Sequence, residues 1–398
     1  MMTDESIVCF AKDWSEDPTS NNHVMKMLAR DNEVLWLNSI STRTPNFGSG
    51  RDLGKIAKKL QSFAKGPVDV ERGLHVYTPI VLPFPHSRAA TLANSQILRA
   101  TVRLMRAKYA MRKDFQLWSF IPTAAQYVGK LGESLVVYYC TDEWSHFSYV
   151  DGAKIVAMEK DLCQRADIVF TTAKTLLERK KAYNPETHLA SHGVDYAHFA
   201  KALDPATETA PEVRDLKHPV IGFVGLIQDW VDTDCIEYLA SKRPEWTFVV
   251  IGKSLVDVSR LAAMPNVRML GRKAYAELPQ YVKTFDVGLI PFRLNELTRN
   301  VNPIKLREYF SAGLPVVSSD IPEVRMYADF AFGDAPGALG CGVYRDHEEA
   351  LALCERALRE DSPAARRRRS DAMQAETWEK KVEALGAHIA RVKAKKRR

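Results

Sequence analysis

The residues best suited to chemistry lie at 302–312, in the sequence NPIKLREYFSA. Asn302 and Pro303 are typical of a helix start, because asparagine caps free amides and proline already has a helical φ. The first turn of such a helix binds anions through unpaired N–H groups and the positive end of its dipole. Glu308, in the second turn, can accept hydrogen bonds from vicinal hydroxyls, as an acid does for a ribose. Together these features indicate a nucleotide site; the alternative is a surface helix with a Lys305–Glu308 ion pair.

The elements that would position this site follow from the pattern of apolar residues. Short β-branched segments alternate with longer amphipathic ones, which predicts parallel sheets covered by helices on both faces. The predicted strands are 6–10, 33–38, 74–80, 115–120, 134–140, 167–172, 220–225, 247–252, 267–271, 287–292 and 314–320. The predicted helices are 21–30, 96–113, 153–165, 232–243, 275–285 and 303–312.

A segment rich in alanine, proline and acidic residues at 200–219 lacks periodicity and is interpreted as a linker. We therefore predict an α/β chain with two Rossmann-like domains, 1–205 and 217–375, whose sheets face a cleft. Residues 376–398 are predicted to form a helix with a basic tail that crosses back to the first domain. Ligands of open α/β sheets bind at the carboxyl ends of the strands, where the helix after residue 302 begins.

Composition narrows the class of protein. The chain has 398 residues, 46% hydrophobic and 26% charged, which is typical of globular proteins. No apolar run approaches the roughly 20 residues that span a bilayer, and the N-terminus does not resemble a signal peptide. The six cysteines have no metal-ligand spacing. We expect reduced thiols, no metal site and a cytoplasmic protein.

The formal charge of +7 is concentrated near the C-terminus. Residues 362–398 hold twelve basic residues, Arg366 to Arg369 among them, against four acids, a net of +8. Such a segment favours solubility or weak contact with anions. No nucleic-acid-binding motif accompanies it, so nucleic acid is not expected as a partner.

The segment 96–113 contains no acidic residue. Leu98, Val102, Met105 and Tyr109 form an apolar stripe at helical spacing, with arginines on the neighbouring face. The favoured interpretation is a helix that packs on the core and has a solvated basic edge. The alternative is peripheral contact with an anionic membrane, such as the inner face of the cell membrane.

Several motifs occur in order between residues 190 and 325. They are HGVDYAHF (192–199), IGFVGLIQDWVD (221–232), NVRMLGRKAYAELPQYVKTFDVGLIPF (266–292) and P-x-K-x-x-E-Y-x-x-A-G-x-P-V-V (303–317). The set resembles the family-4 glycosyltransferases, most closely the branch with teichuronic-acid and exopolysaccharide transferases. The resemblance implies a GT-B fold and a metal-independent, cofactor-free hexosyltransferase that retains anomeric configuration. Its donor would be a nucleotide-sugar, and its acceptor a glycan or lipid-linked glycan in polysaccharide biosynthesis.

The resemblance also assigns roles to residues of the donor site. Glu308 would bind the nucleotide ribose, and the backbone around Asn302, Pro303 and Ile304 would hold the diphosphate. Gly225 would let its loop approach the phosphates.

The base would lie against Gly271, Arg272 and Lys273.

The motif differs from the family in two places. Asn300 stands where the family has a glutamate. The family's basic diphosphate clamp is also missing from the loop after 224, and the cations that could replace it are Lys305, Arg293 and Arg299.

In the first domain, which the resemblance assigns to the acceptor, the expected catalytic residues are Asp142, Glu143 and His23. Asp142 and Glu143 follow an apolar strand at its carboxyl end, where a carboxylate could orient an acceptor hydroxyl; the alternative is helix capping. Two other functions remain open: a GT-B sugar-nucleotide epimerase, and a catalytically degenerate protein that binds a nucleotide-sugar or a partner.

Overall fold

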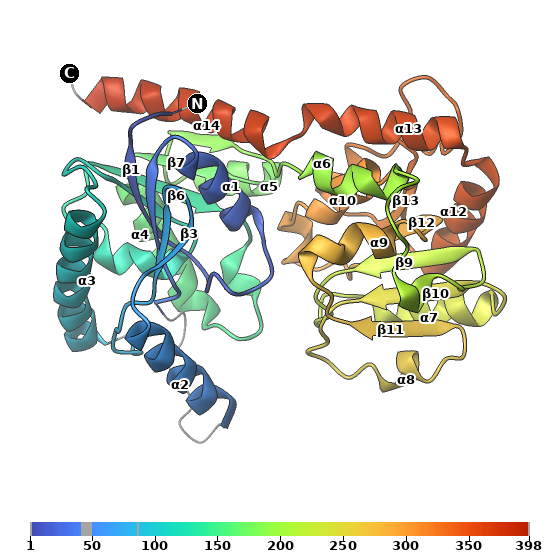
Figure 1. The fold of residues 1–398 in the computed structure, drawn as a ribbon, viewed down its shortest axis with the longest axis horizontal. Coiled ribbons are helices and arrows are strands. Elements are labelled where there is room, and N and C mark those ends of the chain that lie inside the picture. Colours follow the sequence, from blue (N-terminus) through green and yellow to red (C-terminus); the bar gives the residue numbers. More distant parts are fainter. Residues whose placement is uncertain (1, 41–49, 86, 397–398) are drawn as a thin grey trace. The chain divides into compact units, whose positions relative to one another are not determined.

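The computed structural model describes residues 2–40, 50–85 and 87–396, which belong to two compact units (Figure 1). Unit 1 comprises Met1–Ser191 with Lys381–Arg398, and unit 2 comprises His192–Lys380. The segment 200–219 therefore belongs to unit 2. Its Ala210 and Val213 are buried in the core of that unit, so its interpretation as a linker is wrong.

The sheet of unit 1 has the strand order β3-β4-β2-β1-β5-β6-β7-β8. Its strands are β1 (Ser6–Phe10), β2 (Glu33–Leu37), β3 (Val68–Glu71), β4 (Leu74–Tyr77), β5 (Gln116–Ser119), β6 (Leu135–Cys140), β7 (Ile168–Thr171) and β8 (Thr187–Leu189). All neighbours pair in parallel except β3, which runs antiparallel to β4. The six predicted strands of this half are confirmed. The short edge strands β3 and β8 were not predicted.

The sheet of unit 2 is entirely parallel, with the order β11-β10-β9-β12-β13-β14. Its strands are β9 (Val220–Val224), β10 (Thr247–Ile251), β11 (Val267–Gly271), β12 (Val287–Ile290), β13 (Val316–Ser319) and β14 (Cys341–Tyr344). Along β10, Val249 and Ile251 pack in one apolar cluster, whereas Phe248 and Val250 pack in another. Both faces of the sheet are thus buried, as near-continuous apolar strands require.

Helices cover both sheets. They are α1 (Ser20–Ala29), α2 (Gly50–Ala64), α3 (Arg88–Lys108), α4 (Gly152–Arg165), α5 (Lys174–Lys181), α6 (Tyr196–Phe199), α7 (Thr233–Lys242), α8 (Ser259–Ala262), α9 (Leu278–Val282), α10 (Ile304–Ser311), α11 (Pro322–Arg325), α12 (His347–Glu360), α13 (Pro363–Ala372) and α14 (Trp378–Lys396). Helix α3 starts before the predicted 96, because Ser87 caps it by accepting a hydrogen bond from the Ala90 amide. Its Leu98, Val102 and Met105 are buried, so the core-packing interpretation of this helix is confirmed.

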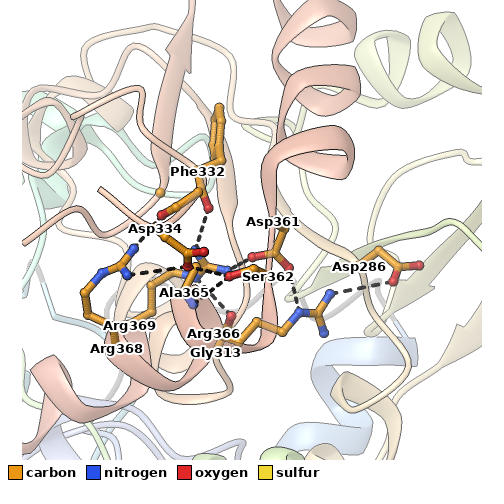
Figure 2. Close-up of polar contacts among 12 residues, drawn as sticks. Asp286, Gly313, Phe332, Asp334, Asp361, Ser362, Ala365, Arg366, Arg368 and Arg369 are labelled. Carbon is orange, nitrogen blue, oxygen red and sulfur yellow. Dashed lines mark hydrogen bonds and ion pairs between the residues drawn. The ribbon is translucent and has the colours of Figure 1, made fainter. Parts of the chain in front are cut away.

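The arginines at the start of the basic C-terminal segment are structural (Figure 2). The Arg369 side chain is fully buried and donates to the carbonyls of Gly313 and Phe332 at 3.0 and 3.1 Å. It also forms an ion pair with Asp361, as does Arg366 at 2.6 Å. The expectation that this segment is solvated is therefore wrong here, since α13 uses these arginines to pack on unit 2.

The end of α14 packs in unit 1, as predicted for the C-terminal helix. Lys393 forms an ion pair with Glu5, next to β1. His388 stacks on His188 of β8, with ring centroids 4.1 Å apart. Burial lowers the pKa of His388, and the nearby His188 and Arg391 lower it further. The helix thus starts in unit 2 and ends in unit 1.

Candidate functional site

In unit 2, the carboxyl edge of the sheet is organised by α10. The Tyr309 hydroxyl accepts a hydrogen bond from the Val224 amide at 2.8 Å, which ties the end of β9 to this helix. A Cβ on Gly288 of β12 would lie 2.5 Å from the Tyr309 ring. Glycine at 288 therefore lets α10 pack directly on the sheet, and the start of the helix lies beside the loops that follow β9 and β12.

The loops after β9 and β10 meet at two glycines. The Gly225 amide donates to the Ile251 carbonyl at 2.9 Å. Gly252 has a φ of +151°, and a Cβ there would lie 1.7 Å from the Gly225 carbonyl oxygen. Only glycine fits at 252, so the predicted phosphate-binding loop at Gly225 contacts the loop that follows β10.

The start of α10 differs from the prediction. Pro303, not Asn302, is the N-cap residue, and no side chain caps the helix. The Asn302 amide oxygen instead accepts from the Arg307 guanidinium at 2.9 Å. Since the first amides of a helix have no intrahelical partner, the N–H groups of Ile304 and Lys305 remain suited to an anion.

Glu308 lies one turn further along α10. Its side chain is only 4% exposed, and one carboxylate oxygen accepts from the Lys305 ammonium at 2.6 Å. The local ion pair considered from the sequence therefore forms. Burial raises the pKa of the nearby Tyr275, and the charge of Glu308 raises it further. This ion pair uses one oxygen of Glu308 and leaves its hydroxyl-binding role a prediction.

Three buried polar atoms at this edge lack a hydrogen-bond partner among the described residues. They are the Asn300 Oδ1, Gln228 Oε1 and Ser254 Oγ atoms, from the loops after β12, β9 and β10. An unpaired buried polar group costs about 1–3 kcal/mol, so such groups are rare without a ligand or water. All three belong to loops at the carboxyl edge of the sheet, where α10 begins.

The basic residues of this edge mostly have acidic partners. Arg293 pairs with Asp234 at 2.8 Å, and Lys273 pairs with Glu212 at 2.7 Å. Arg272 and Arg299 are exposed, and Gly271 has the left-handed φ of +65°.

Lys253, which the sequence analysis missed, is exposed directly after Gly252, and its carbonyl accepts from the Ile227 amide at 3.0 Å. The ion pairs described here include none for Lys253. It is therefore a further candidate for contact with phosphate.

In unit 1, the predicted catalytic residues occupy two different environments. Asp142 is partly exposed after β6, and burial raises its pKa although a hydrogen bond to Thr141 opposes the shift. His23 is buried in the first turns of α1. These positions leave Asp142 as the carboxylate in this group with access to solvent.

Glu143 belongs to a buried ion network. Its carboxylate lies 3.3 Å from the Lys180 ammonium, which also lies 2.6 Å from the Glu159 carboxylate. All three side chains are at most 6% exposed. Burial alone would raise the pKa of Glu143, but Lys180, Ser145 and Arg179 lower it overall. The network keeps Glu143 ionised and fixed, which suits a positioning role behind Asp142.

Comparison with known proteins finds similarity to glycosyltransferases. Residues 218–351 match the family model described as glycosyl transferases group 1. The matched residues all lie in unit 2. The chain is also 28% identical over 244 residues to TuaH of Bacillus subtilis, named as a teichuronic acid biosynthesis glycosyltransferase. That match covers 56% of this chain and spans 58% of the length of TuaH.

Solved structures show that this chain has the GT-B fold. A sucrose-phosphate synthase from Thermosynechococcus elongatus matches with a TM-score of 0.70 and 12% identity, over 98% of this chain and 99% of that one. Anabaena HepE in complex with UDP and glucose matches with a TM-score of 0.66 and 14% identity, over 97% and 99% of the two chains. The two Rossmann-like units with parallel sheets are confirmed.

The matched region holds Asn300, Ile304, Lys305 and Glu308 in or just before α10, and the Tyr309–Val224 hydrogen bond ties this helix to the end of β9, before the Gly225 loop. It does not bring Arg293 or Lys273 there as unpaired cations. Sequence reasoning missed Gln228, Ser254 and Lys253; the signal for all three was their place directly after a predicted strand.

Among the described residues, no group of three or more His, Cys, Asp or Glu side chains could hold a metal ion. No helix in the described ranges is long and apolar enough to cross a bilayer.

Proposed function

We propose that this protein transfers a hexose from a nucleotide-sugar donor to a glycan or lipid-linked glycan, with retention and without a metal, in cytoplasmic polysaccharide biosynthesis. The observation that carries the proposal is the polar carboxyl edge of unit 2. Three buried polar atoms lack partners there, beside an uncapped helix start, in the region that matches the group 1 glycosyltransferases. The similarity to TuaH supports the biosynthetic context.

Each donor group would have a distinct partner. The free amides of Ile304 and Lys305 would bind the diphosphate, which gains negative charge as the glycosidic bond breaks. Lys253 would add the cation that the Gly225 loop lacks. The second oxygen of Glu308 would accept from the ribose hydroxyls, while Lys305 stays paired with the first.

Asn300 Oδ1 would accept from a hydroxyl of the transferred sugar. On the acceptor side, Asp142 would orient the attacking hydroxyl, and the leaving phosphate would take its proton. His23 would contribute to acceptor binding from α1.

Nucleotide binding tests the proposal most directly. We expect one of UDP, GDP, ADP, CMP and dTDP to raise the melting temperature, because ligand at a hundred times its dissociation constant stabilises by about 2.7 kcal/mol. UDP and ADP come first, since HepE binds UDP and Arabidopsis starch synthase IV binds ADP. Failure of every nucleotide to bind, with EDTA present, would refute the donor site.

The ribose contact has a sharper test. A hydrogen bond to a charged group contributes about 1.5–3 kcal/mol. We therefore expect wild type to prefer the ribonucleotide over its 2′-deoxy form by tenfold or more and Glu308→Gln to lose that preference. Glu208→Gln, an exposed acid of the same unit, is the control. If Glu308→Gln keeps the preference, Glu308 serves only its ion pair with Lys305.

The phosphate contact is tested with Lys253→Gln. This variant should weaken nucleoside diphosphate binding several-fold and leave nucleoside binding unchanged, because the lost charge faces only phosphate. Lys217→Gln, another exposed lysine of unit 2, is the control. Equal losses for diphosphate and nucleoside would contradict the assignment.

A second function is favoured by one observation: residues 225–232, GLIQDWVD, contain no basic residue. A degenerate protein that binds a nucleotide-sugar without turnover would tolerate the absence of a basic residue in this loop. Release of nucleoside diphosphate from the donor on addition of a competent glycan acceptor supports the enzyme. Tight binding with no release across acceptors supports the degenerate protein. Isomerisation of the donor sugar without an acceptor would identify an epimerase.

A further inference from the structure

Helix α3 lies at the edge of unit 1 (Figure 1), and its outward face is unusually apolar. The opposite side of this helix is buried through Leu98, Val102 and Met105. On the outward side, Leu92 is 65% exposed and Leu104 is 63% exposed. A helix at a protein surface normally turns polar residues to solvent. Helix α3 instead carries apolar residues on two sides, and only one of them is covered by the core.

The rest of this outward face adds little polarity. Ile97 is also exposed, and four exposed alanines fill the space between the larger side chains: Ala89, Ala93, Ala100 and Ala107. At 100° per residue, Ala93, Ile97, Ala100 and Leu104 form one continuous stripe. The centre of the face is therefore apolar rather than charged.

The loop that leads from β4 into α3 extends the same surface. Asn94 of α3 donates to the Leu82 carbonyl at 2.9 Å and accepts from the Leu82 amide at 2.7 Å, which fixes the loop on the helix. Three large apolar side chains of the loop are exposed: Ile80, Leu82 and Phe84. We call these three residues, with Leu92, Ile97 and Leu104, the α3 surface.

The charge of α3 has a single sign. The helix contains five basic residues and no acidic residue: Arg88, Arg99, Arg103, Arg106 and Lys108. Arg88, Leu92, Arg99 and Arg103 share a stripe next to the apolar one. No ion pair joins Arg88, Arg99 or Arg103 to an acid in the described residues, and all three are exposed. The arginine charges are thus available beside the exposed leucines.

These features favour a lipid surface over a second copy of the chain. In a two-fold contact the same patch meets itself, so the basic helix would face its own charges. An anionic lipid surface instead attracts the basic residues and takes up the apolar ones, while the arginine stems reach up to the headgroups. We propose that the α3 surface docks the protein on an anionic membrane. The docking does not depend on the donor site.

Vesicle flotation of the full chain tests this surface. We expect binding to phosphatidylcholine vesicles with about one third phosphatidylglycerol, little binding to pure phosphatidylcholine, and loss of binding at high salt. Equal binding to both vesicle types, or to neither, would overturn the proposal.

Two paired variants separate charge from apolar contact. A basic residue at an anionic leaflet contributes about 1 kcal/mol, roughly fivefold in partition, so Arg99→Gln with Arg103→Gln should reduce partition about 25-fold. Leu92→Gln with Leu104→Gln should reduce it by about 150-fold or more, since each buried leucine contributes at least about 1.5 kcal/mol. The controls are Arg345→Gln and Met326→Gln, exposed residues of unit 2.

All substituted side chains are exposed, so the variants should melt like wild type. Partition unchanged by both pairs would refute the surface. A concentration-dependent dimer in sedimentation that the leucine pair abolishes would also refute it, in favour of contact between copies. Nucleotide binding should be the same in all variants, so this result is separate from that of the donor site.

Discussion

The buried Lys180 allows a quantitative prediction for unit 1. Lys180→Met removes the cation between Glu159, 2.6 Å away, and Glu143, 3.3 Å away, while keeping most of the side-chain volume. Two carboxylates then share a buried site, and the compensating charge left there is that of Arg179, 3.4 Å from Glu143. Removing one partner of a buried ion pair costs about 3–5 kcal/mol. We expect the free energy of unfolding of unit 1 to fall by that amount at neutral pH.

The effect should depend on pH with a definite sign. In wild type the pKa of Glu143 is lowered, so its stabilising contribution is complete above the unfolded pKa of about 4.3 and is lost as the pH falls through the folded value. Without Lys180, the burial that raises the pKa of Glu143 is opposed only by Ser145 and Arg179. Folding of the variant then takes up a proton. The difference in the free energy of unfolding between wild type and Lys180→Met should therefore become smaller as the pH falls toward about 5.

Hydrogen–deuterium exchange measures this effect separately for each unit, which matters because a protein of two units need not unfold in one step. Peptides from β6 and β7 should lose protection in Lys180→Met, while peptides from β12 and β13 keep it. Lys181→Met, the exposed neighbour, should match wild type. Adding Glu159→Gln to Lys180→Met should restore part of the protection that β6 and β7 lose. If protection of β6 stays unchanged, or the loss is the same at every pH, the network does not stabilise unit 1 as argued.

Three further predictions concern packing and the C-terminal helix. Gly288→Ala should destabilise unit 2 by about 1–3 kcal/mol in thermal melts, because its methyl group meets the Tyr309 ring; an unchanged melting temperature would contradict this. Arg369→Met should cost about 3–5 kcal/mol by the same measurement, whereas Arg367→Met, its exposed neighbour, should cost under about 0.5 kcal/mol. The pKa of His388 is lower in the folded protein than in the unfolded chain. The contribution of His388 to the free energy of unfolding therefore falls as the pH drops below the unfolded pKa of about 6.5. At that lower pH, tryptic cleavage near residue 393 should become faster in wild type. In His388→Asn the rate of cleavage should increase less.

The sequence predicted elements with a strong apolar period and missed those without one. Strands such as Leu135–Cys140 are continuous buried runs, and all of the predicted strands form. Helices α12 and α13 were not predicted, because runs of charged residues there concealed their periodicity. The roles of Arg366 and Arg369 could not be seen locally, since their partners at Asp361, Gly313 and Phe332 are brought to them by the fold.

The same limit applies to the candidate site. The motif around Glu308 placed a polar helix start at the carboxyl edge, and the structure has it there. The sequence could not show that Lys305 occupies one oxygen of Glu308 at 2.6 Å, or that Glu143 is held by Lys180 from another helix. Side chains such as Gln228 and Ser254 carry no sequence signal beyond their place after a predicted strand. Their unpaired atoms emerge only once neighbouring loops are packed.

The division of the chain has a consequence for its synthesis. Residues His192–Lys380 are inserted between β8 and the residues of α14 that complete unit 1. On the ribosome, unit 2 emerges as one continuous segment, whereas Glu5, next to β1, has no ion-pair partner until Lys393 has been added. The first half of the nascent chain therefore remains incomplete throughout translation of the second. We expect unit 2 to fold first. Unit 1 should be completed only when the end of α14 packs against the rest of that unit.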